Sequence, residues 1–546
     1  MTRKETFLVY TFKQVILSVH KESCMPLRQV HCSVLLLSLL VAHVSAATDP
    51  ITQDLLSTRY AVTVDGKPVT VYSYEDMDYI TFPWQGKAKI NVTRLDAKPI
   101  TETRIRPVRL GITSQIKQAN LSFEMDAPRH LVINIDLMRK LVIVPQLPDP
   151  DFPDLNNKSV INVKNIGADS TGKRDNTQLL QQAIDGLPTG GTLYFPAGHY
   201  RTGSLELKSD MTLYVDRHTL IKGSDNFKLH KFRGSYLYFI RAENQQNIRI
   251  LGHGMIDANG GPIRRAWEVE KAKRKVAGRC FLTVNVKNLT IKNTTFRESY
   301  SWNMHFVATD NLHLDRIKVF SSMTNSNGDG LDIDGCHDVL VENCLIFAED
   351  DAITPKGAWL KDQRRDARNF VIRDCVLWSQ MATGIRLGAE THSAEFANMT
   401  FENIDFLRAN TMIRIYNYDG ADIHDIVFKN LWVEEYTLYV QDLGFDEIER
   451  VKKKRDQGQT YFFYVYYRKR TPESQVGLVR DVLIENIHAD RVVKSKLFGM
   501  DRPDGQKSVS NITFKNYIVN GKCITDPKAL KISSEGNAEL ATVICE

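Results

Sequence analysis

The sequence predicts an all-β protein, a right-handed parallel β-helix preceded by a small β-sandwich. Two observations support this prediction: short alternating segments in the N-terminal part of the chain, and a short motif that recurs through the rest. The chain has 546 residues, too many for one small core, although a repeat protein extends that limit. Hydrophobic residues make up 42% and charged residues 25%, as in an ordinary globular protein.

Residues 1–46 are predicted to be a signal peptide. The apolar run Ser33–Ala42 follows Arg28 and precedes Val44-Ser45-Ala46, a small-x-small cleavage pattern. The run is too short to span a bilayer, which takes about 20 residues. Because the region before it is long for a signal, Met25 is an alternative start. The protein is therefore expected to be secreted, extracellular or periplasmic, with no membrane anchor.

Residues 47–146 are predicted to form the β-sandwich. Alternating apolar segments of strand length are separated by turn residues such as Asp65-Gly66. These segments are 60–64, 68–72, 89–93 and 130–135. Residues 147–158 follow, and their three prolines exclude a central strand or a helix. This stretch is predicted to be a stiff linker.

Residues 159–546 are predicted to form the β-helix, sealed at its start by a short α-helix. Asp175 and Asn176 supply capping side chains, and the next residues place five apolar side chains on one helical face. These are Leu179, Leu180, Ala183, Ile184 and Leu187. A strand and a turn follow at 190–200, the order in which a solenoid seals its first coil.

The recurring motif has apolar residues at alternate positions, then a charged residue and, in most copies, asparagine. Its copies end at residues 293, 316, 343, 374, 403, 430, 486 and 516. The interval of 56 residues is interpreted as two coils with the middle copy disguised. Such periods without helices are typical of a parallel β-helix and exclude leucine-rich repeats. The asparagines are predicted to stack between coils and satisfy one another's amides.

The charge and the cysteines exclude several classes of function. A net charge of +6 does not by itself indicate a nucleic-acid partner. The basic segment 452–455 and the aromatic segment 460–467 are interpreted as a hairpin inserted between coils, with tyrosines that stack on sugar rings.

Six of the eight cysteines follow the signal, and export permits disulfides whose pairing the sequence does not fix. No zinc site, other metal site or cofactor is predicted, and a monomer is expected.

Acidic residues concentrate in segments 327–334 and 349–351. Asp329 precedes Asp350 by 21 residues and Asp351 by 22, about one coil, so the three side chains should be neighbours on one face. Crowded carboxylates raise the pKa of one of them. A protonated carboxyl beside ionised ones is what glycoside hydrolysis requires. A calcium site or plain polar turns would explain the same spacing.

Several segments resemble landmarks of glycoside hydrolase family 28, the polygalacturonase family. They are 161–168, 190–198, 247–260, Ser301-Trp-Asn-Met-His305, Gly328-Asp-Gly-Leu-Asp332 and Glu349-Asp-Asp-Ala-Ile353. The resemblance covers about half of the chain and implies a pectin-lyase-like fold. It also implies an inverting mechanism in which Asp350 is the general acid, and Asp329 and Asp351 hold and deprotonate the attacking water. Inversion requires acid and base carboxylates ~6.5–9.5 Å apart.

The sequence departs from the family pattern at two motifs. Thr383 stands where the family has histidine, and Arg414-Ile-Tyr416 keeps the family arginine but replaces its lysine. In the family that pair grips the uronate carboxylate, and losing the ammonium removes a charge-assisted bond. Either Arg386 replaces the lysine or the substrate is not plain galacturonan. The predicted substrate-binding residues are Arg414, Tyr416, His305, Arg386, Glu390 and Lys356.

The predicted function is hydrolysis of an α-linked polysaccharide, with pectic polygalacturonan of the cell wall as the first candidate. The layout of a sandwich before a β-helix also resembles family 49, the dextranases and isopullulanases, so an α-glucan hydrolase is the main alternative. A calcium-dependent polysaccharide lyase and a non-catalytic carbohydrate-binding β-helix also stay open.

Overall fold

The computed structural model describes residues 56–546 apart from 137, 271–276, 324–325, 358, 361–362 and 435–459. Residues Pro50–Glu546 form one compact unit. The predicted signal peptide and the basic segment 452–455 lie outside the described residues. Among the described residues, no helix is long and apolar enough to cross a membrane.

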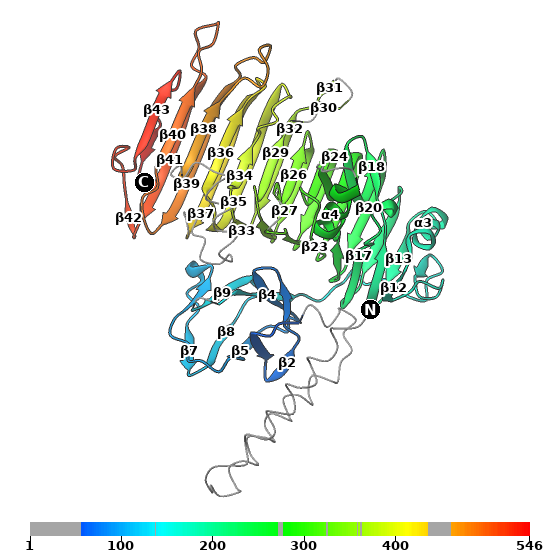
Figure 1. Cartoon of the computed structure of the whole chain (residues 1–546). Helices are drawn as coiled ribbons and strands as arrows, with labels where there is room; N and C mark the ends of the chain where they lie inside the picture. Colours follow the sequence, from blue (N-terminus) through cyan, green and yellow to red (C-terminus); the bar gives the residue numbers. More distant parts are fainter. Residues whose placement is uncertain are drawn as a thin grey trace, which may run out of the picture. The chain divides into compact units, whose positions relative to one another are not determined.

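The first part of the described chain is a β-sandwich of two five-stranded sheets, as predicted (Figure 1). One sheet has the order β2-β1-β5-β8-β7 and the other β3-β4-β10-β9-β6. Their bounds are β1 Tyr60–Val64, β2 Lys67–Val69, β3 Tyr72–Tyr74, β4 Met77–Pro83, β5 Ala88–Arg94, β6 Thr103–Arg106, β7 Ser114–Lys117, β8 Asn120–Met125, β9 Leu131–Ile135 and β10 Lys140–Gln146. The expected strand 68–72 is wrong, because β2 ends and β3 begins within it.

The sandwich core forms because alternate side chains of each strand point between the sheets. Strand β1 alternates buried and half-buried residues along its length. Ile90 and Leu121 of one sheet join Ile80, Ile133 and Ile143 of the other in a single buried cluster. The two sheets therefore share one apolar interior.

The proline-rich stretch after β10 contains no strand and lies against the β-helix. The Asp149 carboxylate accepts a hydrogen bond of 2.6 Å from the Tyr214 hydroxyl. Asp151 pairs with Arg249 at 2.5 Å, and the Phe152 ring packs on Tyr214 with centroids 5.4 Å apart. These contacts anchor the stretch to the first coils.

The remaining chain forms the predicted parallel β-helix, whose coils stack in sequence order in Figure 1. Its 32 strands form one continuous hydrogen-bonded ladder. They are β11 Val160–Asn162, β12 Thr171–Asp175, β13 Gly191–Phe195, β14 Gly198–Thr202, β15 Leu205–Glu206, β16 Met211–Val215, β17 Thr219–Gly223, β18 Lys231–Arg233, β19 Tyr236–Glu243, β20 Gln246–Leu251, β21 Met255–Asp257, β22 Ala277–Lys292, β23 Thr295–Arg297, β24 Met304–Asp315, β25 Lys318–Phe320, β26 Leu331–Asp334, β27 His337–Glu342, β28 Leu345–Ala348, β29 Ile353–Lys356, β32 Ala367–Arg373, β33 Val376–Ser379, β34 Thr383–Leu387, β35 Glu395–Arg408, β36 Thr411–Asn417, β37 Asp422–Val433, β38 Tyr461–Tyr467, β39 Leu478–Ala489, β40 Ser495–Gly499, β41 Val509–Val519, β42 Lys522–Cys523, β43 Ile532–Gly536 and β44 Thr542–Ile544. A separate two-stranded sheet pairs β30 Trp359–Leu360 with β31 Gln363–Arg364.

Helix α3 (Thr177–Gly186) covers the first coil, as predicted. The expected cap by Asn176 is wrong, because its side chain makes no capping hydrogen bond, whereas Asp175 accepts from the Thr177 amide at 2.9 Å. Leu180 and Ile184 are fully buried, and Leu179 and Ala183 pack against the same core. The second described α-helix, α4 (Gly260–Glu270), lies between β21 and β22, and two 3₁₀ helices occupy Val108–Leu110 and Phe227–Leu229.

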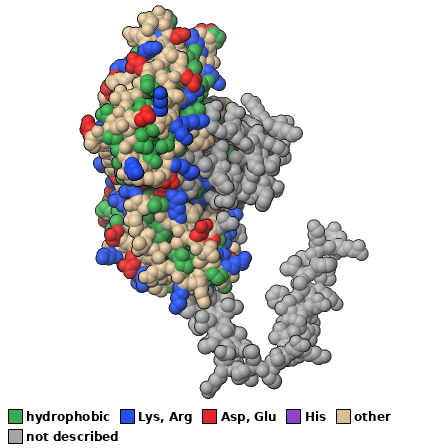
Figure 2. Space-filling model, turned by 90° about the vertical axis from the view of Figure 1, so that its left-hand side faces the viewer, with side chains coloured by type: hydrophobic (Ala, Val, Ile, Leu, Met, Phe, Trp, Pro, Cys, Tyr) green, Lys and Arg blue, Asp and Glu red, His purple; other side chains and the backbone are tan. Residues whose placement is uncertain are grey.

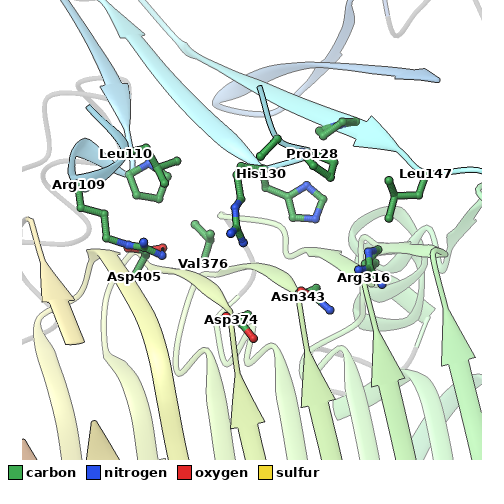
Figure 3. Close-up of a pocket in the computed structure, with 14 residues that line it drawn as sticks. Arg109, Leu110, Pro128, His130, Leu147, Arg316, Asn343, Asp374, Val376 and Asp405 are labelled. Carbon is green, nitrogen blue, oxygen red and sulfur yellow. Dashed lines mark hydrogen bonds and ion pairs between the residues drawn. The ribbon is translucent and has the colours of Figure 1, made fainter. Parts of the chain in front are cut away.

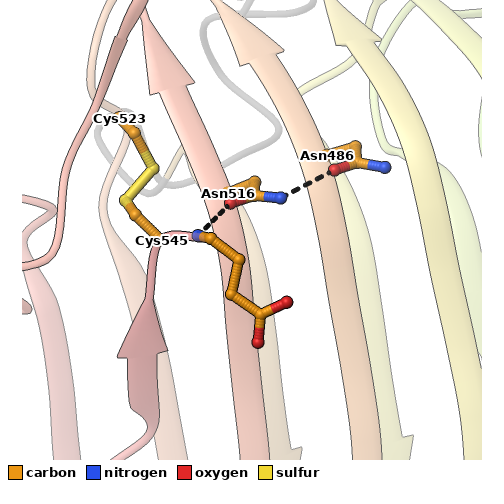
Figure 4. The surroundings of a disulfide bond; sticks show 5 residues. Asn486, Asn516, Cys523 and Cys545 are labelled. Carbon is orange, nitrogen blue, oxygen red and sulfur yellow. Dashed lines mark hydrogen bonds between the residues drawn. A yellow bond between two sulfur atoms is a disulfide. The ribbon is translucent and has the colours of Figure 1, made fainter.

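Asparagines at the recurring turn form the predicted ladder. The Asn486 amide donates to Asn430 at 2.9 Å. The Asn516 amide donates to Asn486 at 3.1 Å, as Figure 4 shows. These residues have φ near +55°, a left-handed conformation that asparagine tolerates better than most residues. The side chain therefore permits the bend and satisfies its neighbour's amide.

The interpretation of the 56-residue interval is wrong. Asn486 bonds directly to Asn430, and β39 pairs with β37 along its length, so one coil separates the two residues. The extra residues form an insertion within that coil rather than a disguised repeat. The expected hairpin at 460–467 is also wrong, because β38 pairs in parallel with β36 and β40 as an ordinary coil strand.

The six cysteines of the described residues divide into one disulfide and four thiols. Cys523 and Cys545 form the disulfide near the C-terminus (Figure 4). The four free cysteines are all buried in the β-helix core: Cys280, Cys336, Cys344 and Cys375.

Substitution of Asn486 separates the two roles of the ladder. Asn486→Gly keeps the left-handed bend but loses two amide hydrogen bonds, which should lower the free energy of unfolding by about 1–3 kcal/mol. Asn486→Ala adds about 1–2 kcal/mol of backbone strain. Urea unfolding should therefore rank the wild type above the glycine variant and the glycine variant above the alanine variant. Asn520→Gly, at an exposed left-handed turn, is the control and should change little. Equal stability of both Asn486 variants would contradict the strain argument.

Candidate active site

The acid segments lie where successive coils present strands of one face in parallel register. Apolar residues of β24, β26, β29, β34 and β36 stack in the core: Met304, Leu331, Ile353, Ile385 and Ile413. Because strand side chains alternate in direction, the residues between them line the outer face. His305 thus stands beside Asp332, and Arg386 beside Arg414.

The three predicted catalytic aspartates occupy the turns that lead into β26 and β29. The Gly330 amide donates to the Asp351 carbonyl at 2.9 Å, so Asp329 and Asp351 belong to adjacent coils, as their spacing predicts. The residues Asp329, Asp350 and Asp351 are 2%, 9% and 0% exposed. Three carboxyl groups are therefore withdrawn from water at one place.

This crowding favours a bound proton in the cluster. Burial raises the pKa of Asp329 well above its ordinary value, and the charges of Asp332, Asp350 and Asp351 raise it further. Among the described residues, one Asp329 carboxylate oxygen is buried without a hydrogen-bond partner. Asp329 is therefore one group of the cluster on which a proton is favoured.

Asp351 is paired with a largely buried cation. Its carboxylate pairs with the Arg386 guanidinium at 2.5 Å and accepts a hydrogen bond of 3.0 Å from the Thr383 amide. Burial lowers the pKa of Arg386, but Asp351, Asp329 and Asp350 together raise it above its ordinary value. Arg386 therefore serves as the counterion of the acid cluster.

Lys356 lies fully buried beneath the outer face. Its ammonium pairs with Glu390 at 2.8 Å and with Asp332 at 3.3 Å, and it lies 3.9 Å from the centre of the Trp302 ring. Burial opposes ionisation of Glu390, yet Lys356 and Arg386 lower the pKa of Glu390 to about 2. Burial raises the pKa of Asp332 to about 7 in spite of Lys356.

His305 lies beside this group as a neutral imidazole. Its Nδ1 accepts a hydrogen bond of 3.2 Å from Arg279, so its Nε2 carries the proton and donates to Asp334 at 3.2 Å. Burial, Arg279 and Lys356 hold the pKa of His305 well below its ordinary value. The Arg279 guanidinium also lies 4.0 Å over the Trp302 ring.

Aromatic rings continue the outer face beyond Arg414. The Arg414 guanidinium lies 5.0 Å from the Tyr416 ring, and Tyr416 contacts Tyr466 with centroids 5.5 Å apart. Tyr466 stacks on Phe498 at the same distance. We name these half-buried rings the aromatic surface: Tyr416, Tyr418, Tyr466 and Phe498.

The structure brings all nine predicted site residues to this region. Asp332, Asp334 and Trp302 fall within segments that the sequence analysis named, but they and Arg279 were not among the predicted site residues; they complete the ion pairs and ring contacts. The alternation in Leu331-Asp-Ile-Asp334 was a usable signal, since it places both aspartates on the outer face of β26. No group of His, Cys, Asp and Glu suited to a metal ion occurs among the described residues.

A separate cavity of about 240 Å³ lies between the sandwich and the β-helix (Figure 3). Its wall includes Arg109, His130, Arg316 and Asp405, of which Arg109 and Asp405 are paired at 2.5 Å. None of the clustered catalytic candidates lines it. The cavity is therefore separate from the predicted catalytic residues.

The fold and the site define a class: a parallel β-helix with a buried carboxylate cluster on one outer face. Residues 188–440 match the family model described as glycosyl hydrolases family 28. This match confirms the resemblance seen in the motifs. A probable polygalacturonase of Vitis vinifera is 28% identical over 305 residues, which are 51% of this chain and 61% of that relative. The chain thus spans less than two thirds of that relative's length.

Two solved structures share the fold. The family 28 exopolygalacturonase of Yersinia enterocolitica has a TM-score of 0.50 and 16% identity, over 84% of this chain and 97% of its own. Dex49A from Penicillium minioluteum has a TM-score of 0.50 and 13% identity, over 90% of this chain and 94% of its own. At such identities the likeness concerns the fold alone.

Replacement of Glu390 tests the buried charge network. Because the pKa of Glu390 is about 2 in the folded chain and ordinarily 4.5, its ionisation stabilises the fold above pH 4.5. That contribution is lost as the pH falls from 4.5 toward 2. Glu390→Gln should lower the free energy of unfolding by about 2 kcal/mol at pH 7, a discounted value because the side chain is 32% exposed.

Urea unfolding between pH 3 and 7 measures this effect. The difference between wild type and Glu390→Gln should shrink toward acid pH, whereas the exposed control Glu102→Gln should show no such trend. A difference that does not change with pH would exclude the Lys356 pair as its source.

Proposed function

We propose that the protein is a glycoside hydrolase that cleaves an α-linked polysaccharide, with polygalacturonan as the first substrate. The observation that carries this proposal is the set of three buried carboxyl groups on two adjacent coils, one of which has a strongly raised pKa. The match to the family 28 model supports the same reaction class. The signal-like segment before residue 47 supports action outside the cell.

The proposed mechanism inverts the anomeric centre. A carboxylic acid protonates the departing glycosidic oxygen while carboxylates activate a water on the opposite face of the sugar. By resemblance Asp350 is the acid, and Asp329 and Asp351 hold the water. Arg386 pairs with the Asp351 carboxylate at 2.5 Å and so holds this proposed base in place. The raised pKa of Asp329 makes it a second candidate for the acid, and variants distinguish the two.

Substrate is proposed to lie along the outer face from the acid cluster to the aromatic surface. Among the described residues, Arg386 is paired with Asp351, whereas no carboxylate pairs with Arg414, whose guanidinium contacts Thr411 at 2.8 Å. Arg414 is therefore the proposed partner of a uronate carboxylate. Pyranose rings are proposed to stack on the rings of Tyr416 and Tyr466. His305, Lys356 and Glu390 are proposed to hold the polar side chains of the outer face in position.

A neutral α-glucan is the second candidate substrate. The layout of a β-sandwich before a β-helix, which also resembles family 49, leaves this alternative open. Tyr416 in place of a cation also favours an uncharged sugar at that position.

Release of reducing ends from polygalacturonate and dextran tests the proposal. Asp350→Asn keeps the size of the side chain but removes the acid, so kcat should fall by at least ~10²-fold with little change in KM. The assays contain EDTA, because a calcium-dependent lyase would lose activity there. Asp490→Asn, at an exposed turn, is the control and should behave as wild type.

Leaving-group chemistry separates the two acid candidates. A nitrophenyl glycoside needs little protonation, so the variant that lacks the acid should recover most of its kcat on that substrate. If Asp329→Asn rather than Asp350→Asn recovers, the assigned roles are reversed. Absence of products from both polymers in the wild type would refute their hydrolysis and leave a calcium-dependent lyase or a binding protein.

The aromatic surface should contribute binding rather than chemistry. Tyr466→Ala removes a stacking face worth about 1 kcal/mol, so KM should rise ~5-fold while kcat stays unchanged. Tyr466→Phe keeps the ring and should leave both constants near wild type. An unchanged KM in the alanine variant would place the sugar chain elsewhere.

A further inference from the structure

The sandwich contacts the turns that precede β24 and β26, the second of which carries Asp329. Its turn between β3 and β4 projects Tyr74 and Glu75 toward the β-helix. The Tyr74 hydroxyl donates to the Glu298 carboxylate at 2.5 Å. The Glu75 carboxylate accepts from the Ser322 hydroxyl at 2.6 Å and from the Met323 amide.

A hydrogen bond connects the residues beside those that Glu75 binds to the residue before Asp329. The Ser321 hydroxyl, next to the residues that Glu75 binds, donates to the Gly328 carbonyl at 2.7 Å. Gly328 precedes Asp329, and the Gly328 carbonyl also accepts from the Glu349 amide at 3.0 Å. A shift of Ser321 and Ser322 would therefore move the backbone of both acid segments.

The turn held by Tyr74 reaches the same place. After Glu298 this turn leads to Asn303, which is fully buried. The Asn303 side chain donates to Ser321 and, at 3.0 Å, to the Asp329 carbonyl. The Asn303 backbone amide donates to that carbonyl at 2.9 Å. The two turns are thus joined to each other at the backbone of Asp329.

An apolar contact keeps the sandwich turn in register with these hydrogen bonds. The Tyr79 and Phe320 rings lie 5.5 Å apart, and Met323 belongs to the same buried cluster. Side chains of the sandwich and of the β-helix share this cluster: Tyr72, Tyr74, Met77, Val132, Val142 and Val144 with Leu345, Phe347, Trp378 and Met381. Movement of Glu75 relative to Ser322 would require this packing to open.

We propose that the β3–β4 turn of the sandwich positions the acid cluster, and that Glu75 is the positioning residue for Asp329. Glu75 touches no reacting atom and acts through Ser322, Met323 and Ser321. A carboxylate that accepts two hydrogen bonds fixes its donors more firmly than either bond alone. The catalytic consequence rests on the proposed hydrolase function, whereas the structural consequence does not.

Amide hydrogen exchange of the full chain tests the structural consequence. In Glu75→Ala, exchange should accelerate in the segment 326–331 by at least about tenfold, because its anchor is lost. Exchange in the distant strand β39 should stay as in wild type. Glu124→Ala, an exposed acid on strand β8 of the same sandwich, should leave both segments unchanged.

Kinetics tests the catalytic consequence. Displacement of Asp329 should lower kcat by roughly 10–100-fold with KM nearly constant, since binding contacts remain. Ser322→Ala should act in the same direction, and the double variant Glu75→Gln/Ser322→Ala should lose less than the sum of the single losses. Glu75→Gln keeps the side-chain size and provides the test where the alanine variant fails to fold.

The outcomes are distinct. Faster exchange in 326–331 alone supports the proposal even if no glycan is cleaved, in which case only the proposed function fails. Exchange in 326–331 equal to wild type, or faster by the same factor throughout the chain, would overturn it.

Discussion

The structure depends on the parallel register of its coils. In this register, core residues align with core residues of the next coil, and turn residues align with turn residues. Leu331 aligns with Ile353, and Ile385 with Ile413, so the core continues through the coils without a change of side. The asparagine ladder maintains this register at the bends, because an amide that bonds to the coil on each side holds its turn at one height. Any residue of a turn is therefore repeated in space at the coil spacing of ~4.8 Å.

The same register explains why acids accumulate where they do and how their charge is balanced. Asp329 and Asp351 are brought together by one coil of sequence and not by a specific interaction between them. Water is excluded there, so each ionised carboxylate needs a cation. Arg386 serves Asp351, and Lys356 serves Asp332 and Glu390. Among the described residues Asp329 has no such ion pair, and burial together with the charges of Asp332, Asp350 and Asp351 raises its pKa.

The sequence predicted contacts that follow from the number of residues between two positions. It did not predict how deeply a side chain is buried. The interval from Asp329 to Asp351 equals one coil, so their contact could be predicted. The burial of Lys356 beneath Trp302 could not, because alternation gives the face of a strand but not the side chains that cover it. The 56-residue interval misled because an insertion lengthens the chain without adding a coil. The number of residues alone does not distinguish an insertion within one coil from an additional coil, whereas the pairing of strands does.

The sandwich packs against turns of the β-helix, which are held less firmly than its strands. The strands β24 and β26 are held by neighbours on both sides, but the turns before them have fewer backbone partners and must take their shape from side chains. Here Asn303 and Ser321 supply part of that shape, and Tyr74 and Glu75 of the sandwich supply more from outside. When catalytic residues lie on turns, their side chains can vary without disturbing the strands, but the turns hold them less rigidly. Packing of a second β-structure against those turns restores the rigidity that a buried, closely spaced set of carboxylates requires.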